Sequence, residues 1–304
     1  MKLIGMMSVR NEAWCLGLSA RVALMWCDEL VIFLHACTDA SRAIVYTISK
    51  DNPGRVHPMW TGGEWLEMEH RQAMLVEARE HGATHLAIID ADEIITGPGL
   101  LECAWDGYRR KIQDMVDGMP RGSILQLPGY NLRGSLNRYH QNGIWGNRWF
   151  SLAFADAEGL HWSGDRFHQR EPMGRPLVNY RPIQQGQGGI LHLWGASERR
   201  LRAKHAHYKL TEALRWPNKP LSEIDRMYNL WRDPRDSAVE YPSQTAWAQP
   251  WVFADVPASW IEPYSHLMKY LNIDAEPWQE SECRRLVAEH GTERFAGLEL
   301  FGVA

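Results

Sequence analysis

Apolar and polar positions alternate along the first third of the chain in a way that predicts strands and helices in turn. Helical spacing of apolar side chains marks residues 14–26 and 64–81, and Thr38-Asp39-Ala40-Ser41 predicts the start of another helix. Short apolar runs, typical of buried strands, occur at Leu3–Val9, Glu29–Leu34, Val56–Trp60 and His85–Ile89. This order predicts an α/β fold with a mostly parallel sheet that is flanked by helices on both faces.

The pattern changes after a helix expected at residues 100–116, which follows a break at Gly97-Pro98-Gly99. From Ser123 onward, short strands rich in glycine and aromatic residues are expected. Residues 197–214 predict a strongly basic helix. The remainder predicts helices and irregular segments, including a stretch rich in proline and tryptophan at residues 241–264.

The fourth predicted strand ends in three carboxylates, Asp90, Asp92 and Glu93. A buried parallel strand delivers such residues to the carboxyl edge of the sheet, where open α/β sheets bind ligands. Close carboxylates repel one another, and burying them is costly unless a positive charge lies between them. Oxygen ligands suit Mg²⁺ or Mn²⁺. The motif therefore predicts a divalent-metal site, and the alternative is a strand end followed by a solvated acidic loop.

Composition narrows the class of protein. A net charge of −4 gives no general attraction to nucleic acid or to an anionic membrane. The five cysteines show no C-x-x-C spacing, which argues against a zinc site or a disulfide framework and favours a reducing, cytoplasmic location. No apolar run approaches the ~20 residues of a transmembrane segment. The 15 tryptophans suit core packing, and they also suit stacking on sugar rings or bases.

Four segments of the first 210 residues match, in order, the motifs of a known enzyme family. Residues 6–12 are similar to an opening strand with K/R-N-E, and residues 28–41 to D-E-I-V-I…S-T-D-x-T. Residues 83–93 are close to a metal-binding strand. The fourth, composite match, to R-L-F…G-x-V-H-E…I-x-H…K, consists of residues 148–150, 162–168, 190–192 and Lys204. The chain thus resembles family 2 glycosyltransferases of the GT-A fold, in the bacterial branch of lipopolysaccharide-core and peptide glycosyltransferases.

The resemblance implies a Rossmann-like GT-A domain with a nucleotide-sugar-binding half at residues 1–122 and an acceptor-side half at residues 123–210. Residues 211–304 would form a mainly helical extension. It further implies metal-dependent transfer of a sugar, with inversion, from a nucleotide diphosphate donor to an acceptor hydroxyl. Mn²⁺ or Mg²⁺ would be the metal, and a UDP-sugar is the first expectation for the donor. The acceptor stays open among a glycan, a lipopolysaccharide core, a peptide and a modified nucleic acid.

The resemblance also implies roles for single residues. Asp92 would bind the metal directly, Asp90 would hold the ribose or a metal-bound water, and His192 would be a further metal ligand. His192 could instead be an ordinary strand-end histidine. Residues expected to border or contact the nucleotide are Arg10, Asn11, Glu12, Asp39, Arg71, Asp90 and Lys204. For two of these a structural alternative stays open: Asp39 could cap a helix without contacting the nucleotide, and Arg71 could be an exposed helix charge.

The general base is expected at Asp165, with His168 and Glu171 as alternatives, because inverting transfer needs a carboxylate or histidine near the acceptor hydroxyl. Glu93 could orient the acceptor or stabilise a helix start. Two positions depart from the family pattern. Leu34-His35-Ala36 lacks the aspartate that contacts uracil in the family, which leaves the nucleobase of the donor open. Gln169 replaces a glutamate of the family.

Other functions fit parts of the sequence. A non-catalytic sugar- or nucleotide-binding protein on the same scaffold is one alternative. A phosphatase of the haloacid dehalogenase type also uses D-x-D, although its motif normally follows the first strand. A polyanionic acceptor such as lipid A phosphates or DNA would suit a basic patch formed by the helix at residues 197–214 together with Arg166, Arg170, Arg175 and Arg181.

Overall fold

The structure is a computed structural model that describes residues 1–97, 105–229, 232 and 250–304, without the side chains of residues 105–110. The break expected at Pro98-Gly99, the start of the helix expected at residue 100, and residues 241–249 lie outside this part. The chain forms two compact units. The first comprises Met1–Gly129, Trp149–His192 and Pro257–Asn272, and the second comprises Tyr130–Arg148, Leu193–Val256 and Ile273–Ala304. This division differs from the expected boundaries after residues 122 and 210.

Among the described residues, the first unit contains most of a sheet of nine strands with the order β3-β2-β1-β4-β8-β6-β10-β5, and β9 pairs with β6. The strands are β1 Leu3–Val9, β2 Glu29–His35, β3 Val56–Thr61, β4 His85–Asp90, β5 Glu93–Thr96, β6 Ser123–Asn131, β8 Arg148–Ala155, β9 Val178–Tyr180 and β10 Gly189–His192. Strands β3, β2, β1 and β4 pair in parallel, whereas β8 joins β4 and β10 joins β5 in antiparallel fashion. The predicted mostly parallel α/β sheet is confirmed.

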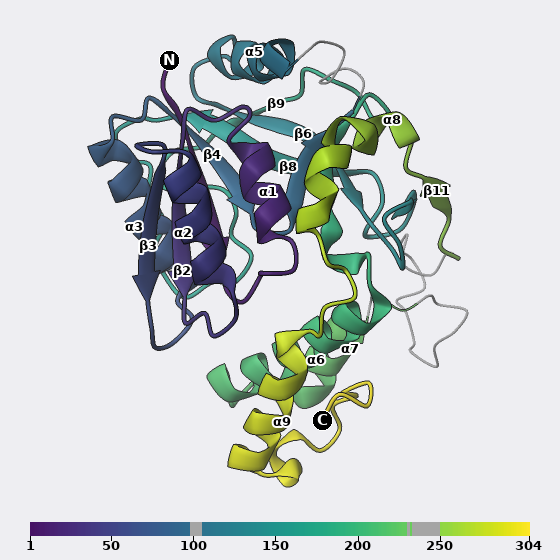
Figure 1. Ribbon diagram of the computed structural model, residues 1–304. Coiled ribbons are helices and arrows are strands. Elements are labelled where there is room, and N and C mark those ends of the chain that lie inside the picture. The colour runs from purple at the N-terminus through teal and green to yellow at the C-terminus, as the bar shows by residue number, and fades with distance from the viewer. Residues whose placement is uncertain (98–104, 230–231, 233–249) are drawn as a thin grey trace. The chain divides into compact units, whose positions relative to one another are not determined.

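Alternate residues of the parallel strands face two different layers. Leu3 and Met7 of β1 pack in one cluster with α1 (Leu16–Ala23), α2 (Ser41–Asp51) and α5 (Trp105–Asp117). Ile4 and Met6 pack in another cluster, with α3 (Glu67–Glu80). Figure 1 shows α1 and α2 side by side over the parallel strands. Helices therefore flank both faces of the sheet, as the sequence predicts.

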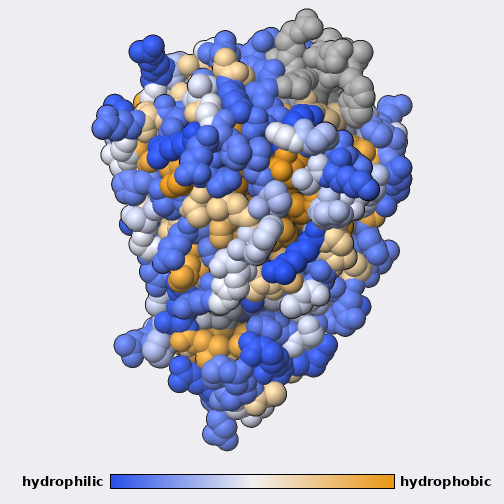
Figure 2. Space-filling view, turned by 60° about the vertical axis from the view of Figure 1, so that its left-hand side comes forward, coloured by the Kyte–Doolittle hydropathy of each residue, from blue (hydrophilic) through white to orange (hydrophobic). Residues whose placement is uncertain are grey.

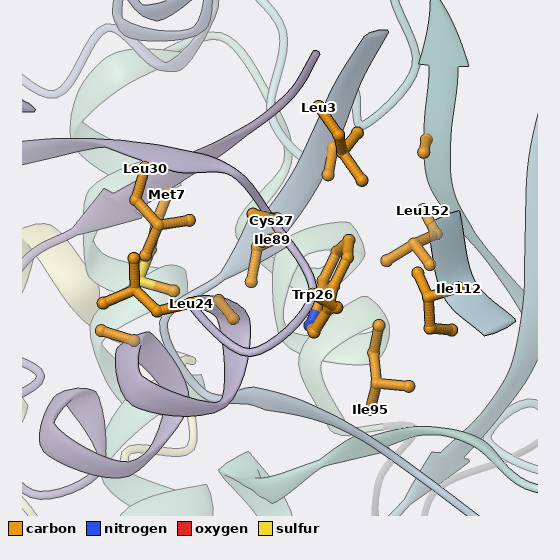
Figure 3. Packing of buried hydrophobic residues seen from close by; sticks show 14 of the residues in the cluster. Leu3, Met7, Leu24, Trp26, Cys27, Leu30, Ile89, Ile95, Ile112 and Leu152 are labelled. Carbon is orange, nitrogen blue, oxygen red and sulfur yellow. The ribbon is translucent and has the colours of Figure 1, made fainter. Parts of the chain in front are cut away.

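Trp26 occupies the centre of the first cluster. Its side chain lies among Ile89, Ile95 and Leu152, from strands β4, β5 and β8, and Ile112 of α5 (Figure 3). Only 1% of Trp26 is exposed, so burial of this ring contributes strongly to stability. On the face drawn in Figure 2, hydrophilic side chains predominate and hydrophobic ones form small patches between them.

The strand order contains a topological switch point between β1 and β4. The chain leaves β1 through α1 on one face, and it enters β4 from α3 on the other face. Ser8 at the end of β1 lies opposite Asp90 at the end of β4. In open α/β sheets, the crevice outside the carboxyl ends of two such strands is the usual ligand site.

A late segment of the chain returns to the first unit as α8 (Ala258–Ile261) and η2 (Glu262–Tyr270). The hydroxyl of Tyr264 donates to the carbonyl oxygen of Ile95 at 2.6 Å. The guanidinium of Arg21 lies 3.8 Å from the ring centroid of Tyr270. Part of the expected C-terminal extension thus helps to build the first unit.

The second unit is mainly helical. It contains the short strand pair β7 (Arg138–His140) and β11 (Phe253–Asp255), then η1 (Leu193–Gly195), α6 (Glu198–Arg215), α7 (Leu221–Asn229), α9 (Trp278–His290) and η3 (Thr292–Phe295). The expected basic helix is confirmed as α6, which begins after Ser197, whose side chain accepts from the backbone N–H of Arg200. Lys209 of α6 is fully buried and donates to Asp225 and Asn229 at 2.7 and 2.8 Å. Within the described ranges, no helix combines the length and apolarity needed to cross a membrane.

Candidate active site

The acidic motif lies where the sequence places it, at the carboxyl end of β4 beside the end of β1. Its three carboxylates differ in exposure: 34% of the Asp90 side chain is accessible, against 8% for Asp92 and 4% for Glu93. Because β5 starts at Glu93, the chain turns sharply within the motif, and the three side chains meet different neighbours. The cluster is therefore not a solvated acidic loop.

Arg170 is the positive charge that two of these carboxylates share. Its guanidinium donates to Asp90 at 2.9 Å and to both oxygens of Glu93 at 2.8 and 2.7 Å. It also donates to the carbonyl oxygens of Ile88 and Ser151 at 2.7 and 2.6 Å. All the bonds run from one planar donor group, so Arg170 fixes the end of β4 against β8 and β5.

These contacts set the charge state of the motif. Burial opposes ionisation of Asp90, but Arg170 and Arg71 together hold the pKa of Asp90 below its usual value. Burial raises the pKa of Glu93, and Arg170 opposes that rise. Burial also disfavours the charged guanidinium, yet Glu93 and Asp90 raise the pKa of Arg170 above its usual value. Two short N–H donors on one carboxylate favour an ionised Glu93.

Arg71 connects the motif to α3. Its guanidinium lies 3.5 Å from Asp90 Oδ1 and donates to Glu67 Oε1 at 3.0 Å. The other oxygen of Glu67 accepts from the backbone N–H of His168 at 2.9 Å. Only 7% of Arg71 is exposed, so the alternative of a free helix charge does not describe it.

Asp92 makes a different pair, with His192 at the end of β10. Asp92 Oδ1 and His192 Nε2 are 3.4 Å apart. The antiparallel register of β10 and β5 places His192 opposite Glu93, next to Asp92 in the chain. Phe150 packs edge-on against the imidazole, with ring centroids 5.6 Å apart. The structure thus brings together two residues that are remote in sequence and that were expected to share a metal.

This pair suits a metal ion. Two neighbouring ligands of an octahedral ion, each ~2.1 Å away, are about 3 Å apart, close to the 3.4 Å between Asp92 and His192. Asp90 does not complete a compact set of three, because in the described part of the chain no such group within 4.8 Å includes these residues. Asp90 instead faces Arg170 and Arg71.

The residues expected near the nucleotide at the end of β1 are tied to the loop after β2. Asn11 adopts a left-handed backbone (φ 55°), and its side-chain oxygen accepts from the N–H groups of Thr38 and Asp39 at 2.7 and 3.2 Å. Asp39 accepts from the N–H groups of Ala13 and Ser41, each at 2.9 Å. The Asp39 carboxylate thus holds the start of α2, in agreement with the structural role given above as the alternative to nucleotide binding. The Glu12 carboxylate accepts from the Trp14 indole at 2.5 Å.

His35, the last residue of β2, stands where the family resemblance lacks its aspartate, and it pairs with His70 of α3. His35 and His70 have ring centroids 4.8 Å apart, and Trp65 packs edge-on against both rings. Burial, together with the charge of nearby Arg10, lowers the pKa of His35. Burial, His35 and Arg10 lower the pKa of His70 to about 4. Neutral imidazoles therefore replace a carboxylate here.

The candidate bases lie in the loop between β8 and β9. Asp165 is exposed, after Gly164 with φ 84°. His168 has a left-handed backbone (φ 61°) and is exposed. Glu171 accepts from the hydroxyl of Ser151 at 2.5 Å. Exposure leaves Asp165 and His168 accessible to an acceptor, whereas Glu93 is buried against Arg170.

Lys204 belongs to the second unit, on α6, where its ammonium lies 5.8 Å from the ring centroid of Trp194. Trp162, in the same loop as the candidate bases, is 2% exposed and donates its indole N–H to the carbonyl oxygen of Gln169 at 3.2 Å. Trp162 is therefore a packing residue. Gln169, at the position of the family's glutamate, is part of the same loop structure.

Sequence reasoning missed two residues that organise the site. Arg170 was expected only as one cation of a basic patch, and Glu67 was not singled out. A signal for Arg170 exists in hindsight: buried carboxylates need a counter-charge. The sequence does not say which arginine supplies it.

No protein-family model matches this chain, and no curated protein matches it. Among solved structures, the chain is similar to S. aureus TarS 1-349 in complex with UDP, at 15% identity over 44% of this chain and 38% of that one, with a TM-score of 0.33. The mannosyltransferase PcManGT from Pyrobaculum calidifontis, in complex with GDP-Man and Mn²⁺, is 11% identical over 95% of this chain and 74% of that one, with a TM-score of 0.43. For glucosyl-3-phosphoglycerate synthase from Mycobacterium tuberculosis, in complex with Mn²⁺, UDP and glucosyl-3-phosphoglycerate, the values are 11%, 44%, 45% and 0.30.

The match to the first and third of these proteins spans less than half of their lengths. At such TM-scores the similarities assign no activity to this chain. The function proposed below rests on its own residues.

Proposed function

We propose that this protein is a metal-dependent glycosyltransferase of the GT-A type, which moves a sugar with inversion from a nucleotide diphosphate donor to an acceptor hydroxyl. The observation that carries the proposal is the Asp92–His192 pair, 3.4 Å apart at the carboxyl edge of the sheet. The pair lies at the switch point between β1 and β4, the place where an open α/β sheet usually binds its ligand. The order of motifs in the sequence supports the same reading.

Each part of the site has a task in this reaction. Mn²⁺ or Mg²⁺ held by Asp92 and His192 would supply positive charge to the diphosphate leaving group. Arg71, already ordered by Glu67, adds a guanidinium beside Asp90. Arg170 holds Asp90 ionised, so that its exposed oxygen can accept from a ribose hydroxyl or a bound water. Asp165 would take the proton from the acceptor hydroxyl.

A UDP-sugar is the first candidate for the donor. The experiment below must identify the nucleobase, because neutral His35, next to His70, stands where the family has a carboxylate. Arg10, Asn11 and Glu12 are proposed to border the nucleotide. The acceptor class stays open among glycan, lipopolysaccharide core, peptide and modified nucleic acid.

The order of elements along the chain disfavours the phosphatase alternative. The phosphatase motif normally follows the first strand, whereas β1, β2 and β3 all precede β4 and its acidic motif here. A non-catalytic binding protein on this scaffold makes a different prediction. It would bind a nucleotide in a metal-dependent way and turn over no donor.

The test is a donor-hydrolysis screen of UDP-, GDP-, ADP- and CMP-sugars with Mn²⁺, combined with calorimetry of nucleotide binding. Asp92→Ala should abolish turnover and metal-dependent binding without changing the unfolding midpoint. Asp51→Ala, at an exposed aspartate that ends α2, is the matched control and should behave as wild type. Wild-type turnover by Asp92→Ala in EDTA would refute the metal assignment.

His192→Ala separates the metal pair from the rest of the site. We expect it to weaken Mn²⁺ binding at least about 10-fold, the lower range seen when a metal site loses a supporting group. Folding should change little, because 20% of the His192 side chain is exposed. Unchanged Mn²⁺ affinity would show that Asp92 acts without His192.

A further inference from the structure

A second group of potential metal ligands lies at the opposite, amino edge of the sheet. Glu29 is the first residue of β2, His57 is the second residue of β3, and His81 directly follows α3. Each offers one ligand atom, and these atoms lie within 4.8 Å of one another. All three residues belong to the first unit.

The contacts within this group hold it in place. His57 Nε2 lies 2.8 Å from Glu29 Oε2, and the ammonium of Lys2 lies 2.6 Å from Glu29 Oε1. The rings of His57 and His81 stack at 3.6 Å with an interplanar angle of 22°. His81 Nε2 lies 3.2 Å from a carboxylate oxygen of Glu77. His81 thus has a carboxylate partner outside the group, as metal-binding histidines usually do, while His57 and Glu29 face each other as neighbouring ligands would.

We propose that Glu29, His57 and His81 form a binding site for a borderline transition-metal ion of the Zn²⁺ class. Two imidazole nitrogens and one carboxylate oxygen are a donor set that Zn²⁺ accepts readily, with one position left for water. Imidazole ligands favour Zn²⁺, Ni²⁺ and Cu²⁺ over Mg²⁺ and Mn²⁺. The site is therefore distinct in place and in metal preference from the pair Asp92 and His192.

The ion enters between His57 and Glu29. Two tetrahedral ligands, each ~2.0–2.1 Å from Zn²⁺, are roughly 3.3 Å apart, so the present 2.8 Å between His57 Nε2 and Glu29 Oε2 must open by about half an ångström. Nε2 must carry no proton to bind the ion, so a neutral His57 binds as the tautomer with its single proton on Nδ1, and a doubly protonated ring releases its Nε2 proton to solvent.

His81 must also move. Stacked rings cannot both point their nitrogens at one ion, because a ligated ion lies in the plane of each imidazole. The His81 side chain is 35% exposed and follows the last residue of α3, so it has room to rotate. If Nε2–H keeps its bond to Glu77, Nδ1 becomes the ligand, in a carboxylate–histidine–metal arrangement.

Lys2 opposes the ion. Its ammonium already neutralises Glu29 Oε1 and also donates to the carbonyl oxygen of His81 at 2.6 Å. A divalent ion on Oε2 meets this charge at short range. Removal of the ammonium should therefore strengthen metal binding, a response that a merely structural histidine pair would not give.

The experiment measures Zn²⁺ binding by calorimetry, and thermal unfolding with and without Zn²⁺, on the full chain with Asp92→Asn, which removes a ligand of the other site. We expect one Zn²⁺ per chain and, at 100-fold excess over Kd, an unfolding midpoint raised on the order of 5 °C. His57→Gln and His81→Gln should each weaken binding at least about 10-fold. Lys2→Met should tighten it.

His266→Gln, at an exposed histidine of η2, is the matched control and should leave Zn²⁺ binding unchanged. The unfolding midpoint without Zn²⁺ verifies that each variant is folded. Absence of Zn²⁺ binding in the Asp92→Asn protein would overturn the proposal, and so would a Zn²⁺ affinity that His57→Gln and His81→Gln leave unchanged. Donor turnover by His57→Gln reports on the proposed glycosyltransferase separately, because that residue lies at the other edge of the sheet.

Discussion

Replacing Arg170 by glutamine should reveal how strongly the acidic motif depends on its internal counter-charge. The guanidinium makes two hydrogen bonds to Glu93, whose side chain is 4% exposed, and one to Asp90. Removing one partner of a buried ion pair typically costs 3–5 kcal/mol. Because Asp90 is 34% exposed and partly hydrated, most of this cost falls on Glu93. We expect a loss of about 3–4 kcal/mol in the free energy of unfolding.

The loss should depend on pH in a defined direction. In the wild type, the pKa of Asp90 is held below its usual value, so its contribution is present above the unfolded value of about 4 and is lost as pH falls through the folded value. Without Arg170, burial raises the pKa of Glu93 unopposed. A raised folded pKa favours stability at low pH and costs stability as pH rises. The difference between wild type and Arg170→Gln should thus be smaller at pH 5 than at pH 8.

Urea unfolding of the two proteins at both pH values measures these differences directly. Arg79→Gln is the matched control, because Arg79 also donates two hydrogen bonds to a carboxylate, that of Asp156, at 2.8 and 2.7 Å. Arg79 is 34% exposed, and solvent screening limits its expected cost to about 1 kcal/mol. Equal losses in both variants would refute the argument, as would a loss from Arg170→Gln that does not change with pH.

Three further predictions concern other parts of the chain. Asp165→Asn should lower kcat for sugar transfer by a factor on the order of 10²–10⁴ with donor affinity nearly unchanged; a collapse of donor binding at constant kcat would instead make His168 or Glu171 the better base. Gly189→Ala places a Cβ 2.0 Å from the carbonyl oxygen of Pro128 and should cost roughly 1–3 kcal/mol more, in urea unfolding, than Gly186→Ala, where the Cβ meets nothing within 4 Å. Lys209→Met removes a fully buried ammonium from Asp225, and a decrease of roughly 3 kcal/mol in unfolding free energy is expected; an unchanged denaturation curve would contradict that role.

Local patterns predicted the first half of the fold well. The strand expected at Leu3–Val9 is β1 without any shift, and the helix expected at residues 64–81 is α3, Glu67–Glu80. Each of these two elements can be recognised from the spacing of its own apolar residues. The return of residues 257–272 to the first unit could not be read from spacing, because it depends on contacts such as that of Tyr264 with Ile95, 169 residues away.

The candidate site, too, was predictable from the sequence only in part. Asp92 and His192 were paired from motif order, and the strand register brings them together. The counter-charge of Asp90 and Glu93 was expected to be a cation from solution, whereas Arg170 provides it. Which of several arginines reaches Glu93 depends on how the loop after β8 folds, and a loop of irregular structure carries no periodic signal.

The antiparallel pairing of β5 with β10 sets the distance between Asp92 and His192 through the hydrogen bonds between these two strands. His192 faces Glu93, and the strands meet again where Gly189 faces Thr96. A strand shifted by one residue turns every side chain to its other face. A single insertion between Gly189 and His192 would therefore point the imidazole away from Asp92, whereas length changes at 184–187 would leave it in place. The site should therefore tolerate length changes in the loop and be lost by length changes within the four residues of β10.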